Sequence, residues 1–512
     1  MKFVKAAAIR EAEQQAIQAN PPLAAEMMGR AGEGLARWVH FISLQAGITD
    51  RRVRLVAGPG NNGGDLFAAA LMLEDVFFTP EVWLACSVER LQGASKYYFE
   101  RLCDCDIPWR EMVNEADWPL DATEPNAPPI FVDGLLGTGA QGAPTGVIRR
   151  AIDYLNAQSQ VSLIVSADVP SGMDADTGAA AGAVVRADFT VTMGFPKAGM
   201  AAPAGWAALG SLSSVDIDLP REAAAQIPDG APGIRWISEA TVRDILPRRE
   251  VAAHKGALGC VQLAGGSAQY PGAMVLAAEG ATRSGVGLVQ VTTAPASAAA
   301  IAARMPEVIV HGDYSADWPM NSKATALVVG PGLGRDPEAR RFIARLLRET
   351  TCPLVLDADA IGVLEGRPDV VRSCPQPVVL TPHPGELAEL LGQDVDAIQS
   401  DRQKFAMMAA EQTGAVVVLK GAGTMIAQEG QATWLNLNGN PGMACGGSGD
   451  VLAGLLGGLL AQGIPPVAAA CAAVWLHGMA GDMAALQHTQ AAMNARDIAV
   501  ALPGAFKRVA VR

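Results

Sequence analysis

The chain has 512 residues, half of them apolar, and a formal net charge of −13 at pH 7. Because a single core rarely grows beyond about 250–300 residues, this length predicts two domains. The acidic balance excludes broad electrostatic attraction to nucleic acid or to an anionic membrane, so we expect small-molecule ligands.

The N-terminal segment and the cysteines bear on the cellular compartment. MKFVKAAAIREAEQQA carries charges where a signal peptide needs an apolar run, and it has the pattern of an amphipathic helix. The eight cysteines occur singly, except for Cys103 and Cys105, whose spacing lacks the CxxC pair of a zinc site. Pro465 and Pro466 divide a long apolar stretch into pieces too short to span a bilayer, which predicts a buried helix pair. We therefore expect a cytoplasmic protein with reduced thiols.

The first half of the chain alternates short apolar runs with alanine-rich stretches of helical period. The runs VRLVAGPGNNGGD, PIFVDGLLGTG, SLIVSADVPSG and ADFTVTMGFPKAG each end in a glycine-rich or acidic loop. This β-α alternation predicts a parallel sheet, in which ligands gather at the carboxyl ends of the strands.

Polar residues follow several of these predicted strands. GPGNNGGD, which begins at Gly58, precedes a helix, so its amides can cradle a pyrophosphate, although Asn-Gly is also a common turn. Asp133 and Asp168 follow apolar runs, and we expect both carboxylates to reach the same edge of the sheet as Asn62. Oxygen ligands from Asn62, Asp133 and Ser171 suit a hard cation. The alternative is that these aspartates only cap helices or loops.

The alternation weakens across residues 219–235, LPREAAAQIPDGAPGIR, which contain three prolines and mixed charges. We place a domain boundary there, giving domains of residues 1–225 and 226–512. A second alternating series follows, with the runs GCVQLAGGS, GLVQVTT, ALVVGPGLG, PLVLDADA, PVVLTPHPGE and AVVVLKGAGT. It predicts a second parallel sheet with polar residues at its strand ends.

The segment MACGGSGD, residues 443–450, sets glycines and a carboxylate directly before a long apolar helix. Backbone amides at a helix N-terminus favour an anion, so this segment predicts an anion site. Asp450 is then either a helix cap or a functional acid. Ser448 lacks the G-x-S-x-G context of a nucleophile, and no histidine lies near it in the sequence. The glycines of the predicted anion site are Gly446, Gly447 and Gly449.

Other strand ends of the second half carry further candidates. Lys420 in LKGAGT can place a positive charge beside a nucleotide, although lone Lys-Gly pairs are common in loops. His383 and Glu386 in TPHPGE are candidates for ligand or metal contacts, or else for hydrogen bonds within the loop. The glycines of GPGLG either pack against a ligand or make a tight turn.

Seven motifs of the second half occur together, namely HKGALG, GGSAQYPGA, VVGPGLG, LDADA, LTPHPGE, LKGAGT and NPGMACGGSGDVLAG. They resemble the ADP-dependent NAD(P)H-hydrate dehydratase family, which has a ribokinase-like α/β fold. The resemblance implies Mg²⁺ bound with ADP, and Asp450 as the substrate-binding base that takes the proton from the C6 hydroxyl of the hydrated ring. It further implies substrate binding by Ala273, Gly334 and His383, and nucleotide binding by Lys420, Gly421, Ala422, Gly423, Thr424 and Gly449.

The motifs of the first half, with FPKAG near Lys197 and AEMMGRAG near Glu26, resemble the NAD(P)H-hydrate epimerase family over most of residues 1–220. This resemblance implies a Rossmann-like three-layer α/β domain, with Asp168 as the acid–base group. It implies potassium at Asn62, Asp133 and Ser171. The implied substrate-binding residues are Asn61, Asn62, Gly63, Gly64, Asp65, Gly137, Thr138, Gly139, Ala140, Gln141, Gly142, Ala143 and Asp168.

The first half departs from its family pattern at one position. The family commonly continues NNGGDG, whereas Leu66 follows Asp65 here. We expect the bulkier side chain to tighten the entrance of the loop and to slow epimerisation.

Together the resemblances imply a bifunctional repair enzyme. It would interconvert the R and S forms of NADHX and NADPHX and dehydrate the S form with ADP, releasing AMP and phosphate; the family leaves room for a homo-oligomer. One alternative is a ribokinase-like small-molecule kinase, because a glycine loop beside an acid serves hydroxyl phosphorylation equally well. Another is a binding or sensor protein whose first half has lost catalysis.

Overall fold

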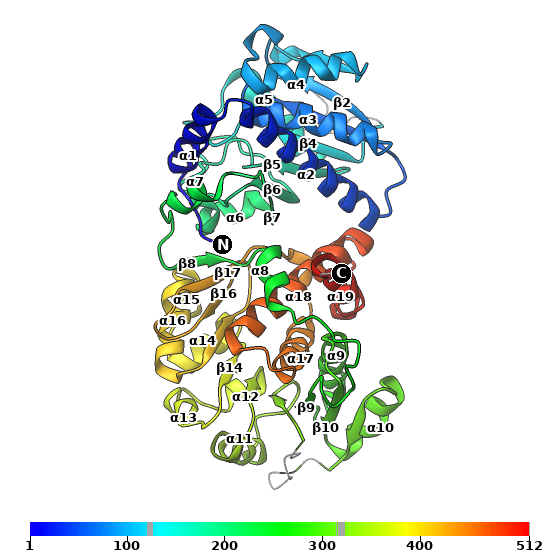
Figure 1. Cartoon of the computed structure of the whole chain (residues 1–512). Coiled ribbons are helices and arrows are strands. Elements are labelled where there is room, and N and C mark those ends of the chain that lie inside the picture. The colour runs from blue at the N-terminus through cyan, green and yellow to red at the C-terminus, as the bar shows by residue number, and fades with distance from the viewer. Residues whose placement is uncertain (120–125, 314, 316–322, 511–512) are drawn as a thin grey trace. The chain divides into compact units, whose positions relative to one another are not determined.

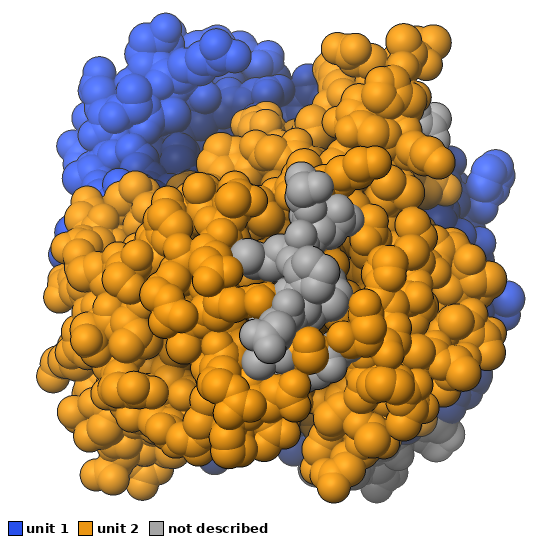
Figure 2. Space-filling view, turned by 90° about the horizontal axis from the view of Figure 1, so that it is seen from below, with its two compact units in different colours: residues 1–236 blue, residues 237–512 orange. Residues whose placement is uncertain are grey.

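The structure is a computed structural model that describes residues 1–119, 126–313, 315 and 323–510. It divides into two compact units, Met1–Trp236 and Ile237–Arg512, which Figure 2 shows in different colours. The division falls after β8 (Ile234–Trp236), whereas the sequence placed the boundary between residues 225 and 226. Each unit is described by itself below.

The first unit is built on a parallel sheet in the order β3-β2-β1-β4-β5-β6-β7 (Figure 1). The order reverses between β1 and β4, and ligands bind at such a switch point in doubly wound folds. The predicted parallel sheet is confirmed. Its strands are β1 (Arg52–Ala57), β2 (Thr79–Leu84), β3 (Trp109–Glu111), β4 (Ile130–Gly134), β5 (Leu163–Ala167), β6 (Phe189–Met193) and β7 (Ser211–Val215).

Helices cover both faces of this sheet. Crossover connections are right-handed, so α3 between β1 and β2 and α5 between β4 and β5 lie on opposite faces, because the strand order runs in opposite directions there. The helices are α1 (Ala6–Ala19), α2 (Leu23–Gln45), α3 (Asn61–Asp75), α4 (Gly93–Asp104), α5 (Gly146–Gln158), α6 (Pro203–Leu209) and α7 (Arg221–Gln226).

The second unit holds strands in the order β11-β10-β9-β12-β13-β14-β15-β16-β17. The pairs from β11 to β15 are parallel, and the switch point lies between β9 and β12; β15, β16 and β17 are antiparallel. The predicted parallel series is confirmed, but the antiparallel end was not predicted. The strands are β9 (Cys260–Ala264), β10 (Leu288–Thr292), β11 (Ile309–His311), β12 (Ala326–Val329), β13 (Leu354–Leu356), β14 (Val378–Leu380), β15 (Val416–Leu419), β16 (Thr424–Ala427) and β17 (Thr433–Asn436).

The helices of the second unit include the two that the apolar C-terminal stretch predicted. These are α17 (Ser448–Ala461) and α18 (Pro466–His488), and both are almost entirely buried. By length and composition α18 alone among the described helices could cross a membrane, but 89% of its apolar window is buried inside the protein, as in a core helix. The others are α8 (Glu239–Ile245), α9 (Pro271–Arg283), α10 (Pro295–Arg304), α11 (Pro337–Glu349), α12 (Asp359–Gly362), α13 (Asp369–Arg372), α14 (Pro384–Leu391), α15 (Val395–Ser400), α16 (Arg402–Thr413) and α19 (Ala495–Val509).

The glycines of α17 are explained by helix packing. A Cβ on Gly454 would overlap the carbonyl oxygen of Ala277 in α9, and a Cβ on Gly280 of α9 would overlap the carbonyl oxygen of Val451. The two helices therefore touch backbone to backbone. This contact fixes the axis of the helix whose first turn carries Asp450.

Candidate active sites

The first candidate site lies at the switch point, where α3 begins at Asn61 directly after the loop that follows β1. Asn62 Nδ2 donates to Leu136 O at 2.7 Å and to Ala167 O at 3.0 Å, so its side chain joins the ends of β4 and β5. Asn62 Oδ1 is buried and has no hydrogen-bond partner in the described structure. A buried acceptor without a protein partner is able to bind an ion or accept a hydrogen bond from water.

Asp133 ends β4 and is fully buried. Its Oδ1 accepts from Ser171 Oγ at 2.6 Å and from Leu135 N at 3.2 Å, and its Oδ2 accepts from Ser166 Oγ and Ser171 N, both at 2.9 Å. Burial raises the pKa of Asp133, and the hydrogen bonds from Ser171 oppose this. Hydrogen bonds to the Asp133 carboxylate therefore connect the loop after β5 to β4.

The three predicted cation ligands are linked by hydrogen bonds, since Asp133 binds Ser171 and both Ser171 and Asn62 bind Leu136. Ser171 Oγ accepts from Leu136 N at 2.8 Å, and Leu136 O is the acceptor for Asn62. An orphan amide oxygen beside a hydroxyl and a buried carboxylate is a set of oxygen donors that fits a potassium ion. Elsewhere in the described ranges, no three His, Cys, Asp or Glu side chains are arranged to hold a metal.

Asp168 follows β5 in a left-handed conformation, with φ of 61°. Such a backbone is strained for an aspartate and marks candidate functional positions. Lys197 Nζ, Met193 N at 3.0 Å and Thr192 Oγ1 at 3.2 Å all donate to Asp168 Oδ1. No donor of the described chain reaches Oδ2, so one oxygen positions the carboxylate and the other is available for chemistry. From the sequence Lys197 was known only as part of a motif, without a role.

The glycines of NNGGD are required by packing. A Cβ on Gly63 would overlap the carbonyl oxygen of Gly58, and a Cβ on Gly64 would collide with Ser95 Oγ. The first turn of α3 therefore lies close to the preceding loop, which also exposes its amides to the switch point. These glycines support the site whether or not they touch a ligand.

The two residues after these glycines are buried. Asp65 is 9% exposed, and burial together with the charge of Asp168 raises its pKa well above the ordinary value. Leu66 is fully buried and packs against Gly134. The expectation that Leu66 tightens the loop entrance is wrong, because its bulk is accommodated inside the unit.

The predicted loop of residues 137–143 starts at the site and ends in solvent. A Cβ on Gly137 would lie 3.2 Å from Asn62 Cβ, whereas residues 139–143 are exposed. Thr138 O accepts from Arg10 Nη1 of α1. The structure therefore brings Gly137 and Thr138 to the site and leaves Gly139, Ala140, Gln141, Gly142 and Ala143 at its open side.

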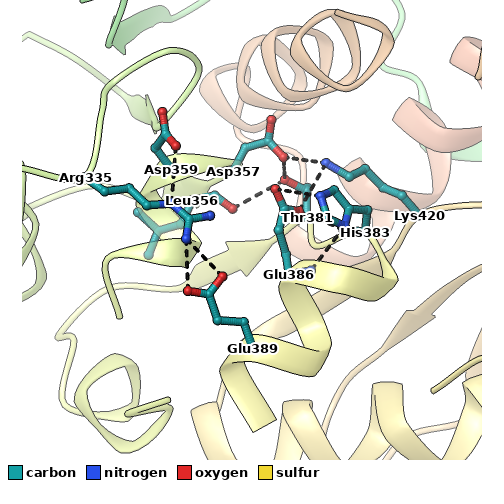
Figure 3. Close-up of polar contacts among 9 residues, drawn as sticks. All are labelled: Arg335, Leu356, Asp357, Asp359, Thr381, His383, Glu386, Glu389 and Lys420. Atoms are coloured by element: carbon teal, nitrogen blue, oxygen red, sulfur yellow. Dashed lines mark hydrogen bonds and ion pairs between the residues drawn. The ribbon is translucent and has the colours of Figure 1, made fainter. Parts of the chain in front are cut away.

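The second candidate site is centred on Lys420, which begins the turn between antiparallel β15 and β16. Lys420 Nζ donates to Asp357 Oδ1 at 2.7 Å and lies 3.8 Å from Glu386 Oε2 (Figure 3). Burial lowers the pKa of Lys420, but the charges of Asp357 and Glu386 outweigh it and raise the pKa. The lysine is therefore a fixed positive charge.

Asp357 is a residue of this site that the sequence did not single out. It follows β13, is 1% exposed, and accepts from Thr381 Oγ1 at 2.6 Å (Figure 3). The signal was present, because LDADA sets an aspartate at the end of an apolar strand as VSAD does in the first half. Its role in the structure is to position Lys420.

Asp450 lies in the first turn of α17. Gly447 is the N-cap, in a left-handed conformation with φ of 91°, and no side chain caps the helix. The helix-cap alternative for Asp450 is therefore wrong, and its carboxylate makes no hydrogen bond with the described residues. Burial and the charge of Asp357 raise the pKa of Asp450 to about 7, against the opposing charge of Lys420. At neutral pH this group both loses and gains a proton.

Gly449, one of the glycines of the predicted anion site, lies close to Lys420. A Cβ at this position would lie 3.2 Å from Lys420 Nζ. The rest of the predicted nucleotide loop is more open, since Gly421 and Ala422 are exposed and Thr424 Oγ1 turns back to Gly421 O at 2.8 Å. Gly423 is buried in the same turn.

Arg402, the first residue of α16, supports this turn, and the sequence analysis did not single it out. Its Nη2 donates to Leu419 O at 3.0 Å and to Lys420 O at 2.9 Å. Burial lowers the pKa of Arg402 to about 10. No pattern around this residue separates it from an ordinary helical arginine.

His383 caps α14 in the structure. Its Nδ1 accepts from Glu386 N at 3.1 Å, and Glu386 Oε2 accepts from His383 N at 2.8 Å. The interpretation of His383 as a residue that hydrogen-bonds within its own loop is confirmed. The ring remains more than half exposed and can still face a ligand.

Gly334 contacts Asp359, and Ala273 lies beside the turn that contains Gly334. Gly334 N donates to Asp359 Oδ2 at 2.9 Å, and Asp359 in turn raises the pKa of Asp450 by its charge. Arg335 binds Asp359 and also Glu389 (Figure 3). Ala273 Cβ lies 3.2 Å from where a Cβ on Gly332 would be, so Ala273 lies beside the GPGLG turn.

The structure corrects the sequence argument about Ser448. His477 of α18 places its Nε2 3.4 Å from Ser448 Oγ, although 29 residues separate the two in the chain. Burial lowers the pKa of His477 to about 4, so the ring is neutral at physiological pH. Both side chains are buried, and the pair supports the start of α17.

Known proteins match both units. The NAD(P)H-hydrate dehydratase family matches residues 261–504, and the family described as YjeF-related protein N-terminus matches residues 24–199. The bifunctional NAD(P)H-hydrate repair enzyme Nnr of Moorella thermoacetica is 35% identical over 476 residues, which cover 91% of this chain and 88% of that one. The enzyme of the same name from Escherichia coli is 34% identical over 497 residues, covering 96% and 91%.

A solved structure is also similar. The ADP/ATP-dependent NAD(P)H-hydrate dehydratase of Bacillus subtilis, co-crystallised with ATP and Mg²⁺, matches with a TM-score of 0.51 and 34% identity, covering 55% of this chain and 100% of that chain. With the match to the first unit, this confirms the predicted α/β classes, including the ribokinase-like fold. The chain belongs to the family of bifunctional NAD(P)H-hydrate repair enzymes.

Proposed function

We propose that the chain restores hydrated NADH and NADPH in two steps, epimerisation in the first unit and ADP-dependent dehydration of the S form in the second. The observation that carries the proposal is Asp450, a carboxyl without a hydrogen-bond partner in the described chain, whose pKa of about 7 suits a general base. It lies beside a fixed lysine and the N-terminus of α17.

In the dehydration, Asp450 takes the proton of the C6 hydroxyl while that oxygen attacks the terminal phosphoryl group of ADP. The positive charge of Lys420 and the amides at the start of α17 stabilise the charge that develops on the phosphoryl oxygens. Phosphate is a better leaving group than hydroxide, so the C6–O bond breaks as the ring nitrogen lone pair forms the iminium. Loss of a proton from C5 to water then restores the ring double bond, and AMP and inorganic phosphate are released.

The nucleotide would bring magnesium to this site. Because no three acidic side chains of the described residues form a metal site, the ion would be held chiefly by the nucleotide phosphates, with Asp357 and Glu386 as the nearest protein oxygens. Magnesium would neutralise phosphate charge. The negative charges of Asp357 and Glu386 repel a polyphosphate that carries no magnesium.

In the epimerisation, Asp168 exchanges protons with the hydroxyl that leaves and returns at C6. Lys197 positions the carboxylate through Oδ1, so Oδ2 is the oxygen that performs the transfer. Asn62, Asp133 and Ser171 would hold potassium, which would add a positive charge near the amide end of α3. The chain would then act on small molecules only, in the cytoplasm.

The proposal is tested by adding the purified protein to a mixture of R and S hydrated NADH with ADP and magnesium, and following absorbance at 340 nm. Complete recovery of NADH supports both activities, and a control without ADP should show no recovery. Recovery that stops at the S fraction would remove the epimerase. A stable phosphorylated product without NADH would replace the proposal with a ribokinase-like kinase.

A further inference from the structure

Helix α1 precedes the residues that the family model of the first unit matches, since that match starts at residue 24. The structure nevertheless fixes the start of α1 to the first site. Val4 N donates to Pro196 O at 2.9 Å, and Ala198 N donates to Val4 O at 2.8 Å, so Val4, two residues before the start of α1, pairs with both neighbours of Lys197. The first turn is held by Asp176 Oδ1, which accepts from Ala6 N at 2.7 Å.

The side chains of α1 reach the site from one stripe of the helix. Ala6, Ile9 and Glu13 recur at helical spacing, and the first two are buried. Ile9 Cδ1 lies 3.9 Å from where a Cβ on Gly194 would be, and Gly194 follows Met193, a donor to Asp168. Glu13 is one turn further along the same stripe and is partly buried.

Arg10, three residues before Glu13, contacts the loop on the opposite side of the site. Its guanidinium donates to Thr138 O. Because residues i and i+3 are neighbours on a helix, Glu13 lies on the same side of α1 as the residue that contacts this loop. Helix α1 therefore spans the site from the Lys197 segment to residues 137–143.

The charges around Glu13 come from four elements. Burial and the charge of Asp168 raise its pKa to about 7, and the charges of Lys197 and Arg10 oppose this shift. Burial, followed by the charges of Asp168 and Glu13, raises the pKa of Asp65 in α3 well above its ordinary value. Near neutral pH Glu13 is therefore divided between its acid and its carboxylate.

We propose that Glu13 is a second acid–base residue of the first site and acts together with Asp168; this rests on the proposed epimerase function. Inverting C6 requires hydroxide to leave from one face of the ring and water to add to the other, which two carboxyl groups serve better than one. Glu13 gives its proton to the leaving hydroxyl, the C6–O bond breaks, water departs, and the ring nitrogen lone pair forms the iminium. Asp168 takes a proton from the water that then adds, and exchange with solvent resets both groups.

The test is Glu13→Gln, with Glu11→Gln as the matched control because Glu11 is exposed on the same helix. Conversion of purified R to S hydrate is followed by chromatography without ADP, so that the second unit takes no part, and the buffer rate is subtracted. We expect kcat to fall about 10²-fold in Glu13→Gln with little change in KM, and the dependence of kcat on pH near 7 to disappear. Glu11→Gln keeps the wild-type rate and profile.

Three results separate the possibilities. Equal kcat and equal pH profiles for the two variants would overturn the inference about Glu13, and so would a change confined to KM, which indicates a binding role. Matching thermal unfolding midpoints of the variants exclude misfolding as the cause of a loss, which is expected because glutamine is isosteric with the protonated acid. A wild-type protein that does not interconvert R and S would sink the epimerase proposal itself, whatever Glu13 does.

Discussion

In the first unit a buried lysine contacts the carboxylate assigned to acid–base chemistry, whereas in the second unit the lysine contacts a different carboxylate. Lys197 donates directly to Asp168, but Lys420 donates to Asp357 and only faces Asp450 across Gly449. As a result Asp450 itself has a pKa near neutrality, while in the first unit Glu13, outside the ion pair, has that property. In each unit the carboxyl with a pKa near neutrality is therefore one that the lysine does not bind.

The chemistry of each unit accounts for this difference. Phosphoryl transfer needs a single base beside a fixed positive charge, so a lysine that is held by Asp357 serves the phosphate and leaves Asp450 unbound. Epimerisation needs no anion site, so the lysine is available to position Asp168. Substitutions at the acid groups, at His477 and at Asn62 test this difference between the units.

The largest effect is expected from replacing Asp450 and Asp168, each in a separate variant. Asp450→Asn should lower ADP-dependent turnover of the S hydrate by about 10²–10⁴-fold, because an amide cannot take the hydroxyl proton. Asp168→Asn should leave that turnover unchanged and reduce only R-to-S conversion. Wild-type turnover should rise with pH through about 7, where Asp450 loses its proton. A turnover of Asp450→Asn close to that of the wild type at 340 nm would end its assignment as the base.

An intermediate effect is expected at His477, which supports the start of α17. Its folded-state pKa of about 4 lies below the ordinary 6.5, so the unfolded chain binds a proton that the folded chain rejects as the pH falls from 6.5 to 4. Stability is therefore lost on acidification, by about 3 kcal/mol across this window. Urea unfolding should show that His477→Gln loses correspondingly less stability than the wild type between pH 7 and pH 4. Parallel pH curves for the two proteins would contradict the burial of a neutral ring.

The smallest effect is expected at Asn62. Replacing it with alanine removes two hydrogen bonds from Nδ2 and should cost about 1–2 kcal/mol, because Oδ1 has no bond to lose in the described structure. Potassium should raise the thermal midpoint of the wild type relative to lithium, since an ion bound only by the folded state stabilises it. Asn62→Ala should lose this response. A variant that keeps it would place the ion elsewhere.

The parallel parts of the fold could be predicted from the sequence, but the antiparallel end could not. Short apolar runs predicted β1, β4, β5 and β6 in the first unit and β9, β10, β12, β13, β14 and β15 in the second, but no run predicted β11. The same reasoning took Lys420 as the end of another β-α unit, whereas residues 420–423 form a turn to antiparallel β16. The signal was the length of the connection, because so few residues cannot hold a crossover helix.

The candidate sites divide in a similar way. Residues that follow strands are brought together because the carboxyl ends of parallel strands meet at one edge, which is why Asn62 and Asp133 were expected to lie close. Glu13 and His477 reach their partners through helices that are remote in the chain, and nothing in their neighbouring residues signals it. Asp357 belongs to the first kind and was overlooked.

The backbone contact between α17 and α9 has a consequence for engineering this enzyme. Glycine-to-alanine exchange inside a helix is a standard route to thermostability, yet Gly454 and Gly280 have no room for a methyl group. An alanine at either position would push α17 off its neighbour and displace Asp450 with it. Stabilising substitutions are therefore better sought in surface turns, and a library that varies these glycines would lose both stability and turnover.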